Sequence, residues 1–242
     1  MQSVTRAVSI LETLRGLGRP CTTSEIARTL DLDRTVVYRL VRTLAASGIL
    51  TENSGKYFLG PQNVLYSNSY LDRLAIRRIA LPYAIELQSK VIKGNPWVTA
   101  LSVYARDSVT IIDRIWSPET PLDSVLDVGT TFPIDRSAGG RLVLAHLPPD
   151  DAVALVGKAK FRELKPTLEE IRRVGGVEIA LGDAGPGIGA VVAAIFARSG
   201  AVVATFGVSG PNMDDVLDRE GDLAVRLRRA ADSIGAALSS DG

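Results

Sequence analysis

The sequence contains very few of the residues that build most catalytic and metal sites. Its 242 residues include one cysteine, Cys21, and one histidine, His146. A single cysteine excludes an intrachain disulfide and a cysteine-rich zinc site, and it fits a reducing compartment. His146 precedes two prolines in LAHLPPDD, and the chain has no G-x-S-x-G motif, so we expect a solvated or capping histidine. We therefore predict no catalytic residues, no metal and no cofactor.

Long apolar segments are missing as well. The longest apolar run, residues 188–196, is too short to span a bilayer. No charged segment followed by an apolar stretch opens the sequence, so no signal peptide is expected. Aromatic residues make up only 5% of the chain against 46% hydrophobic residues, which predicts mostly aliphatic cores. These features predict a cytoplasmic protein without a membrane partner, with one or two domains.

A strong excess of one charge is also lacking, since the formal net charge is +1. The distribution is more informative than the total. Residues 1–60 hold 8 Lys/Arg and 5 Asp/Glu, a net of +3, and the remainder holds 20 and 22, a net of −2. This asymmetry is modest, and it gives limited support to contact between the N-terminal third and nucleic acid.

The most informative pattern that the sequence does contain lies in residues 23–60. Residues 24–30 predict a short helix, which Thr23 or Ser24 can cap through a hydroxyl group. A turn at residues 31–33 leads into a second helix over about residues 34–46. One face of this second helix is aliphatic, and the opposite face carries Arg34, Thr35, Tyr38, Arg39 and Arg42. A helix of this kind suits the major groove of DNA.

A predicted β-hairpin follows at the distance expected of a wing. Residues 49–52 and 56–59 alternate around the turn Asn53-Ser54-Gly55, and Lys56 lies where a wing would meet phosphate. Another helix, over residues 3–17, leads into the module and is expected to turn Val4, Ala7, Val8, Leu11 and Leu14 inward. The whole pattern predicts a winged helix-turn-helix.

Several segments together resemble the isocitrate-lyase-regulator (IclR) family of bacterial transcription regulators. They are SVTRAVSILETL at 3–14, SEIARTLDLDRTVVYRLVRTLAASGIL at 24–50, YFLG at 57–60, IDRSAGGRLVLAHLP at 134–148, LEEIRRVGGVEIA at 168–180, and GAVVAAIFARSGAVVATFGVSGP at 189–211. The resemblance covers essentially the whole chain in the expected order and is strongest in the N-terminal third. It implies an α+β protein with an N-terminal winged helix-turn-helix domain, a linker helix and a C-terminal GAF-like α/β effector-binding domain.

The resemblance also implies a site for a small organic effector. Ser137, Ala138, Gly139 and Gly140 match the family's loop and helix N-terminus at that site, where backbone amides could hold a carboxylate. Asp183 stands near a position that is usually acidic, and Ser209 matches a serine near the end of the last hairpin. Ala190, Ala194 and Gly207 stand where the family often has cysteine, proline and serine. These departures leave open whether the effector is an organic acid or an aromatic metabolite.

Three further residues carry alternatives. Trp97 either stacks on an aromatic ligand or belongs to the core or to a dimer contact. Arg114 and Arg136 are either carboxylate partners or solvated surface charges.

Hydrophobic patterning predicts the remaining elements and the domain boundaries. We expect helices over residues 62–75 and 76–93 with Pro82 kinking or breaking the chain between them, strands at 97–105, 109–116 and 121–128, helices at 138–145, 150–157 and 167–174, a hairpin of 189–197 with 201–209, and a closing helix at 214–238. The predicted domains are a DNA-binding domain over 1–60, a linker helix over 61–80 and an effector-binding domain over 81–242.

The pattern thus predicts a regulator that binds double-stranded operator DNA, responds to a small organic effector, and works as a homodimer or homotetramer. A dimer is expected because one module offers only one recognition helix. The alternative is a small-molecule-binding or enzymatic α/β domain whose N-terminal module serves protein contacts only.

Overall fold

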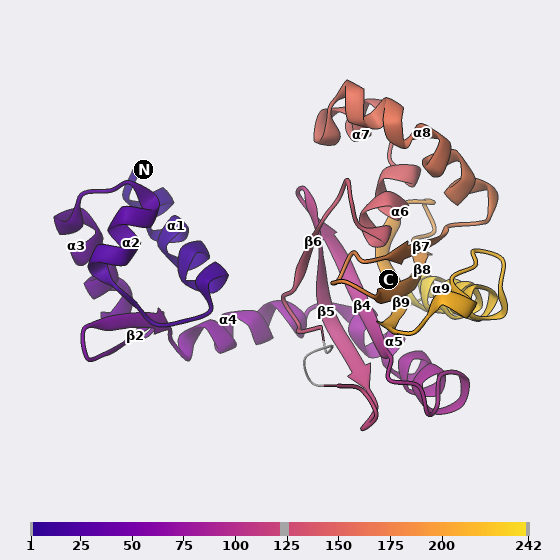
Figure 1. Cartoon of the computed structure of the whole chain (residues 1–242), viewed down its shortest axis with the longest axis horizontal. Coiled ribbons are helices and arrows are strands. Elements are labelled where there is room, and N and C mark those ends of the chain that lie inside the picture. The colour runs from indigo at the N-terminus through magenta and orange to yellow at the C-terminus, as the bar shows by residue number, and fades with distance from the viewer. Residues whose placement is uncertain (1, 122–125, 241–242) are drawn as a thin grey trace. The chain divides into compact units, whose positions relative to one another are not determined.

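The computed structural model describes residues 2–121 and 126–240 and divides into two compact units, Met1–Arg73 and Leu74–Gly242 (Figure 1). The first unit is a winged helix-turn-helix with its own core. Its elements are α1 (Gln2–Leu17), β1 (Cys21–Thr22), α2 (Thr23–Leu30), α3 (Arg34–Ala46), β2 (Leu50–Asn53), β3 (Lys56–Leu59) and α4 (Gln62–Leu71). The three strands form one antiparallel sheet in the order β1-β3-β2.

Local hydrogen bonds fix both helices of the helix-turn-helix. The N-cap of α2 is Thr22 and not Thr23 or Ser24, so that prediction was wrong by one residue. Thr22 Oγ1 accepts from the amide of Glu25 at 3.2 Å, and the Thr22 amide donates to Glu25 Oε2 at 2.8 Å, which is a capping box. Asp33 caps α3 by accepting from two backbone amides.

Helix α1 packs through a narrower face than the sequence predicts. Ile10 and Leu14 are buried in the core of the unit, whereas Val4 and Val8 are 70% and 47% exposed. At about 100° per residue, Val4 and Val8 lie on a face adjacent to the one that carries Ile10 and Leu14. The apolar residues of α1 therefore cover a wider arc than one packing surface can bury, and the inward assignment of the two valines was wrong.

The second unit is a six-stranded antiparallel sheet between helices, as expected of a GAF-like domain. Its elements are α5 (Ala75–Glu86), a π-helical turn (Leu87–Val91), β4 (Val98–Ala105), β5 (Ser108–Trp116), β6 (Thr131–Pro133), α6 (Ala138–His146), α7 (Pro149–Val156), α8 (Lys158–Arg173), β7 (Val177–Leu181), β8 (Ile188–Phe196), β9 (Val202–Pro211), a 3-10 turn (Asp214–Val216) and α9 (Asp222–Ser240). The strand order is β6-β5-β4-β9-β8-β7.

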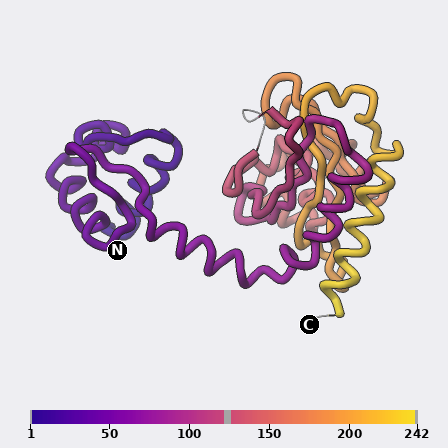
Figure 2. The backbone as a smooth tube through the Cα atoms, turned by 90° about the horizontal axis from the view of Figure 1, so that it is seen from below, coloured from indigo at the N-terminus to yellow at the C-terminus, as the bar shows by residue number. Residues whose placement is uncertain are grey.

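The helices cover the sheet on two sides. Helices α5 and α9 lie side by side (Figure 2), with α5 against β4 and β5 and α9 against β8 and β9. Helix α6 packs against β7 and β8, and α8 packs on α6. Side chains alternate between the faces of a strand. Leu101 and Phe206 therefore lie by α5, while their neighbours Ser102 and Thr205 line a pocket on the α6 side.

Several predicted boundaries were wrong. The interruption between α4 and α5 falls at residues 72–74, where Leu74 has an extended backbone, and Pro82 lies inside α5. Helix α8 begins at Lys158 and continues through Pro166 instead of starting at 167. The closing segment is a 3-10 turn and a separate helix, because residues 218–221 form a turn.

Three short strands escaped prediction, and one predicted strand cannot be judged in full. β1, β6 and β7 hold only 2, 3 and 5 residues, which is too short for a clear alternating pattern. The predicted strand at 121–128 lies partly on residues 122–125, outside the described residues, and its described flanks are not in a strand.

Candidate DNA interface and ligand pocket

Helix α3 of the first unit has an apolar face and, on the opposite side, a basic face. Val37 and Val41 are fully buried against α1 and α2. The five residues predicted to face DNA are all exposed, and at about 100° per residue they span an arc of about 140°. They are Arg34, Thr35, Tyr38, Arg39 and Arg42. This face holds three arginines, a hydroxyl group and a phenol, all of which can contact base edges or phosphates.

The wing contributes one exposed cation and one acidic side chain. Lys56 is exposed at the start of β3, directly after the turn at Ser54 and Gly55, which both have positive φ angles. Glu52 on β2 lies 3.6 Å from the Arg42 guanidinium. Burial, followed by the nearby Glu52, raises the pKa of Tyr57. The Arg42–Glu52 pair links the basic face of α3 to the wing, a contact that sequence reasoning missed.

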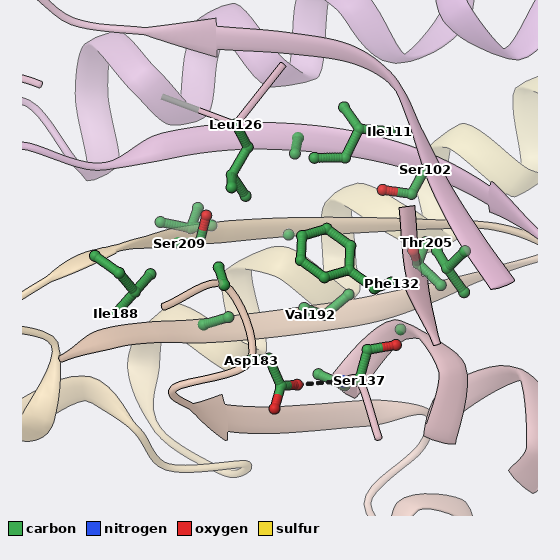
Figure 3. A pocket seen from close by; sticks show the side chains of 18 residues that line it. Ser102, Ile111, Leu126, Phe132, Ser137, Asp183, Ile188, Val192, Thr205 and Ser209 are labelled. Atoms are coloured by element: carbon green, nitrogen blue, oxygen red, sulfur yellow. Dashed lines mark hydrogen bonds between the residues drawn. The ribbon is translucent and has the colours of Figure 1, made fainter. Parts of the chain in front are cut away.

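A small cavity lies in the second unit between the sheet and the N-terminus of α6 (Figure 3). It measures about 590 Å³, including the space at its mouth. Most of its lining is apolar, and the polar side chains come from three strand residues, the α6 N-cap and one acid. The lining residues are Ala100, Ser102, Val109, Ile111, Leu126, Phe132, Ser137, Ala138, Gly139, Asp183, Ala184, Ile188, Ala190, Val192, Thr205, Gly207, Val208 and Ser209.

The start of α6 is built around a serine and two glycines. Ser137 Oγ accepts from the Gly140 amide at 3.0 Å and donates to the Pro133 carbonyl at 2.8 Å, which caps the helix. A Cβ atom on Gly140 would overlap the carbonyl of Ile134, whose carbon would be 2.6 Å away. A Cβ on Gly139 would instead point at pocket side chains, 3.3 Å from Thr205 Oγ1. Gly140 thus permits close packing, and Gly139 leaves space in the pocket.

Asp183 connects the loop before β8 to this helix start. Its Oδ2 accepts from the Ala138 amide at 2.8 Å and lies 3.9 Å from Nη2 of Arg141. Burial raises the pKa of Asp183, and the Ala138 hydrogen bond and Arg141 partly oppose that rise. Arg141 and Arg219 both pair with the buried carboxylate of Glu178, at 2.9 and 2.8 Å. We call Arg141, Glu178, Asp183 and Arg219 the charge cluster.

The pocket brings together five of the residues predicted to bind an effector. They are Ser137, Ala138, Gly139, Asp183 and Ser209. Gly140 faces Ile134 and does not line the cavity. Trp97 also lies outside the lining, because its buried indole donates from Nε1 to the Pro211 carbonyl at 2.9 Å. The core alternative therefore describes Trp97, and the predicted stacking position was wrong.

Neither arginine that was considered as a carboxylate partner lines the cavity. Arg114 pairs with Asp127 at 2.8 Å and lies over the ring of Trp116. Arg136 is mostly exposed beside Asp135.

Sequence reasoning predicted Ser209 but missed the other strand residues of the pocket. Ala100 and Ser102 alternate on β4, and Thr205, Gly207 and Ser209 alternate on β9. Small residues at every second position can signal a sheet face that leaves space instead of packing on a helix. That signal was present in the sequence, but only the pairing of β4 with β9 brings the two sets together.

The described residues give no indication of a metal or a membrane segment. Within the described ranges, no three His, Cys, Asp or Glu side chains form a group that could hold a metal ion. His146 is half-buried against Phe196, its Nδ1 is 2.9 Å from the Leu142 carbonyl, and burial lowers its pKa. No helix in the described part of the chain is long and apolar enough to cross a membrane.

The first unit is a winged helix-turn-helix with an exposed basic helix, and the second is an α/β unit with a small pocket. These two features define a DNA-binding regulator controlled by a small molecule. Comparison with known families agrees. The model of the bacterial transcriptional regulator IclR C-terminal domain matches residues 68–236, and the IclR helix-turn-helix model matches residues 3–54. The chain belongs to the IclR family of bacterial transcriptional regulators.

Individual relatives are similar to the chain over nearly its whole length. The chain is 28% identical over 255 residues to the glycerol operon regulatory protein of Streptomyces griseus, covering 100% of the chain and 96% of the relative. It is 23% identical over 250 residues to the transcriptional repressor AllR of Salmonella typhimurium, covering 98% of the chain and 90% of the relative. An IclR family regulator from Brucella abortus has a similar fold, with a TM-score of 0.79, 21% identity and coverage of 98% and 92%. An IclR homolog from Microbacterium hydrocarbonoxydans complexed with 4-hydroxybenzoate also has a similar fold. Its TM-score is 0.74 at 22% identity, covering 98% of the chain and 99% of the homolog.

Proposed function

We propose that the exposed face of α3 reads operator DNA in the major groove and that the wing contacts the phosphate backbone. The reading residues are Arg34, Thr35, Tyr38, Arg39 and Arg42, and Lys56 is the phosphate contact. The observation that carries this proposal is the division of α3, which buries Val37 and Val41 completely and leaves all three arginines exposed. Arginine forks match guanine edges and phosphates, so this face suits both kinds of contact.

The working unit in this proposal is at least a homodimer, or a homotetramer, in the cytoplasm. One winged module reads only a half-site, and affinity for a near-palindromic operator needs two recognition helices at a fixed spacing. Residues 1–60 form the DNA-binding domain, residues 61–80 the linker and residues 81–242 the effector-binding domain. The division of the chain after Arg73, inside the assigned linker, supports this organisation.

The cavity beside α6 is the proposed effector site. The effector contacts five lining residues: Ser137, Ala138, Gly139, Asp183 and Ser209. Gly140 and Trp97 lie outside the lining and contribute through their packing against Ile134 and Pro211. A relative named for a glycerol operon and a neighbour in complex with 4-hydroxybenzoate support a small organic molecule as the effector. The protein acts by binding and not by catalysis, since an effector changes DNA affinity by preferring one of two states.

A DNA-binding measurement tests the proposal. The full chain should shift a fragment of its own upstream region, and Arg39→Ala/Arg42→Ala should lose that shift. Arg162→Ala is the control for arginine loss away from α3, because it removes one positive charge from an exposed position on α8 of the second unit. Equal binding by the double variant and the control would show that α3 is not the reading helix. Absence of any specific binding by the wild-type chain would favour the alternative of a module for protein contacts.

A further inference from the structure

We infer that the pocket takes an uncharged ligand: a compact, mostly apolar molecule that carries a hydroxyl, carbonyl or amide group. This inference rests on the proposed function, because it concerns the same cavity, and it narrows the class of effector. Three features of the cavity support it. The Asp183 carboxylate binds the start of α6, the two arginines of the charge cluster are paired with its two carboxylates, and the other lining residues are uncharged.

The start of α6, where a ligand carboxylate would bind, already holds a carboxylate of the protein. A helix N-terminus favours an anion through its dipole and its free amides. At α6 the side chain of Asp183 supplies that anion by accepting from the Ala138 amide at 2.8 Å (Figure 3). The Gly140 amide donates to Ser137 Oγ, and within the described residues only the Gly139 amide of this first turn has no hydrogen-bond partner. A ligand carboxylate at this position would have to displace Asp183 or stand beside its charge.

The two cations of the charge cluster are also engaged. Arg141 donates to Glu178 and to the carbonyls of Arg136 and Ile179, and Arg219 donates to Glu178. The charge cluster therefore sets two guanidinium groups against two carboxylates. An anionic ligand would add a negative charge with no free partner in the cluster. A cationic ligand would compete with Arg141 and with the positive end of α6 for Asp183. Burying an uncompensated charge of either sign is costly.

The rest of the cavity suits a neutral polar group. Ser102, Thr205 and Ser209 present hydroxyls from β4 and β9, and none of the three is hydrogen-bonded to a residue within the described ranges. A hydroxyl can donate or accept, so it pairs with a neutral group without leaving a net charge. Phe132, Ile111 and other apolar side chains complete the lining. The enclosed part of the cavity is small and mostly apolar, which suits a single ring or a short branched chain.

Three probes that share one ring and differ in charge test this inference. Benzyl alcohol, benzoate and benzylamine are titrated into the full chain at pH 7 by calorimetry, where the last two are an anion and a cation. We expect benzyl alcohol to bind at least about tenfold more tightly than either charged probe, a difference of about 1.4 kcal/mol. Equal or tighter binding of benzoate or benzylamine, or binding of none of the three, overturns the inference.

The variant Asp183→Asn tests the cause of the preference. An amide oxygen can still accept from the Ala138 amide, but the negative charge is gone. We expect the affinity for benzoate, measured relative to that for benzyl alcohol, to rise at least about tenfold. Asp150→Asn is the matched control, since it removes the same charge from an exposed position in the first turn of α7. An unchanged preference in Asp183→Asn contradicts the role assigned to that carboxylate.

The variant Gly139→Leu separates this inference from the proposed function on which it rests. A leucine there fills the space beside Thr205 and Val109 and should abolish binding of benzyl alcohol. Circular dichroism establishes that the variant is folded, and the smaller change Gly139→Ala serves if it is not. If benzyl alcohol binds a folded variant as it binds the wild type, the probe occupies another place and the proposed effector site is wrong. If binding is lost but the wild type prefers a charged probe, only the inference about charge fails.

Discussion

The adjacent glycines at the start of α6 should respond to the same substitution in opposite ways. Both lie in the first turn of α6, where alanine is intrinsically favoured over glycine by about 1 kcal/mol. In Gly140→Ala, the added carbon would overlap the backbone of Ile134. Backbone cannot move aside as a flexible side chain can. Overpacking of this kind costs about 1–3 kcal/mol, and sometimes more, which exceeds the gain in helix propensity.

In Gly139→Ala, the added carbon would meet only side-chain atoms, at 3.3 Å from Thr205 Oγ1 and Val109 Cγ1. A shift of a few tenths of an ångström relieves these contacts, and the gain in helix propensity offsets what remains. We therefore expect little change in stability, while the methyl group occupies space in the proposed effector pocket. The two variants are matched, because they add the same atom to neighbouring positions of one helix.

Thermal unfolding followed by circular dichroism measures the difference. For a domain of this size, a change of 1 kcal/mol shifts Tm by about 2–4 °C. Gly140→Ala should lower the Tm of the second unit by at least a few degrees, whereas Gly139→Ala should stay within about 2 °C of the wild type. Equal shifts in the two variants, or a larger loss for Gly139→Ala, would refute the assignment of one glycine to packing and the other to the pocket.

Three further outcomes follow from the first unit. Arg39→Ala/Arg42→Ala should weaken operator binding by about 1–3 kcal/mol for each base-reading contact, and a gel shift that matches the wild type would contradict this. Lys56→Ala should weaken specific and random DNA alike, whereas a loss confined to operator DNA would exclude a phosphate contact. Hydrogen bonds from Thr22 and Arg19 lower the pKa of Glu25 to about 2, from 4.5. The charged carboxylate therefore stabilises the folded state above pH 4.5, so Glu25→Gln should lower Tm at neutral pH. The difference in Tm between the variant and the wild type should disappear as the pH falls toward 2. A constant difference in Tm across that range would exclude the mechanism.

The sequence predicted the first unit well because its structure depends on local signals. The bounds of α3 were correct, since Asp33 caps it and its aliphatic residues recur with the helical period. The hairpin was predicted from alternation around Asn53-Ser54-Gly55. The cap of α2 was misplaced because three hydroxyl residues, Thr22, Thr23 and Ser24, stand in a row and each could accept the same hydrogen bond.

The second unit was harder to predict because its pocket depends on contacts between distant segments. Ser137 to Gly139 could be found because they form one contiguous helix start. The hydrogen bond from Ala138 to Asp183 joins residues 45 positions apart, and nothing local indicates it. The orientation of Trp97 depends on Pro211, which follows the pairing of β4 with β9. Patterning could predict these strands but not which of them would be neighbours.

The central pairing of the sheet has a consequence for how the protein is synthesised. β4 and β5 leave the ribosome early, yet the second neighbour of β4 is β9, with Val98 opposite Ser209 and Ser102 opposite Thr205. Until β9 emerges, β4 has an unpaired edge that can pair wrongly, and one wall of the pocket does not exist. The nascent chain therefore holds all the residues of the winged unit long before it can sense any effector. A chain that stops after β8 would keep those residues and lack the wall of the pocket that β9 provides.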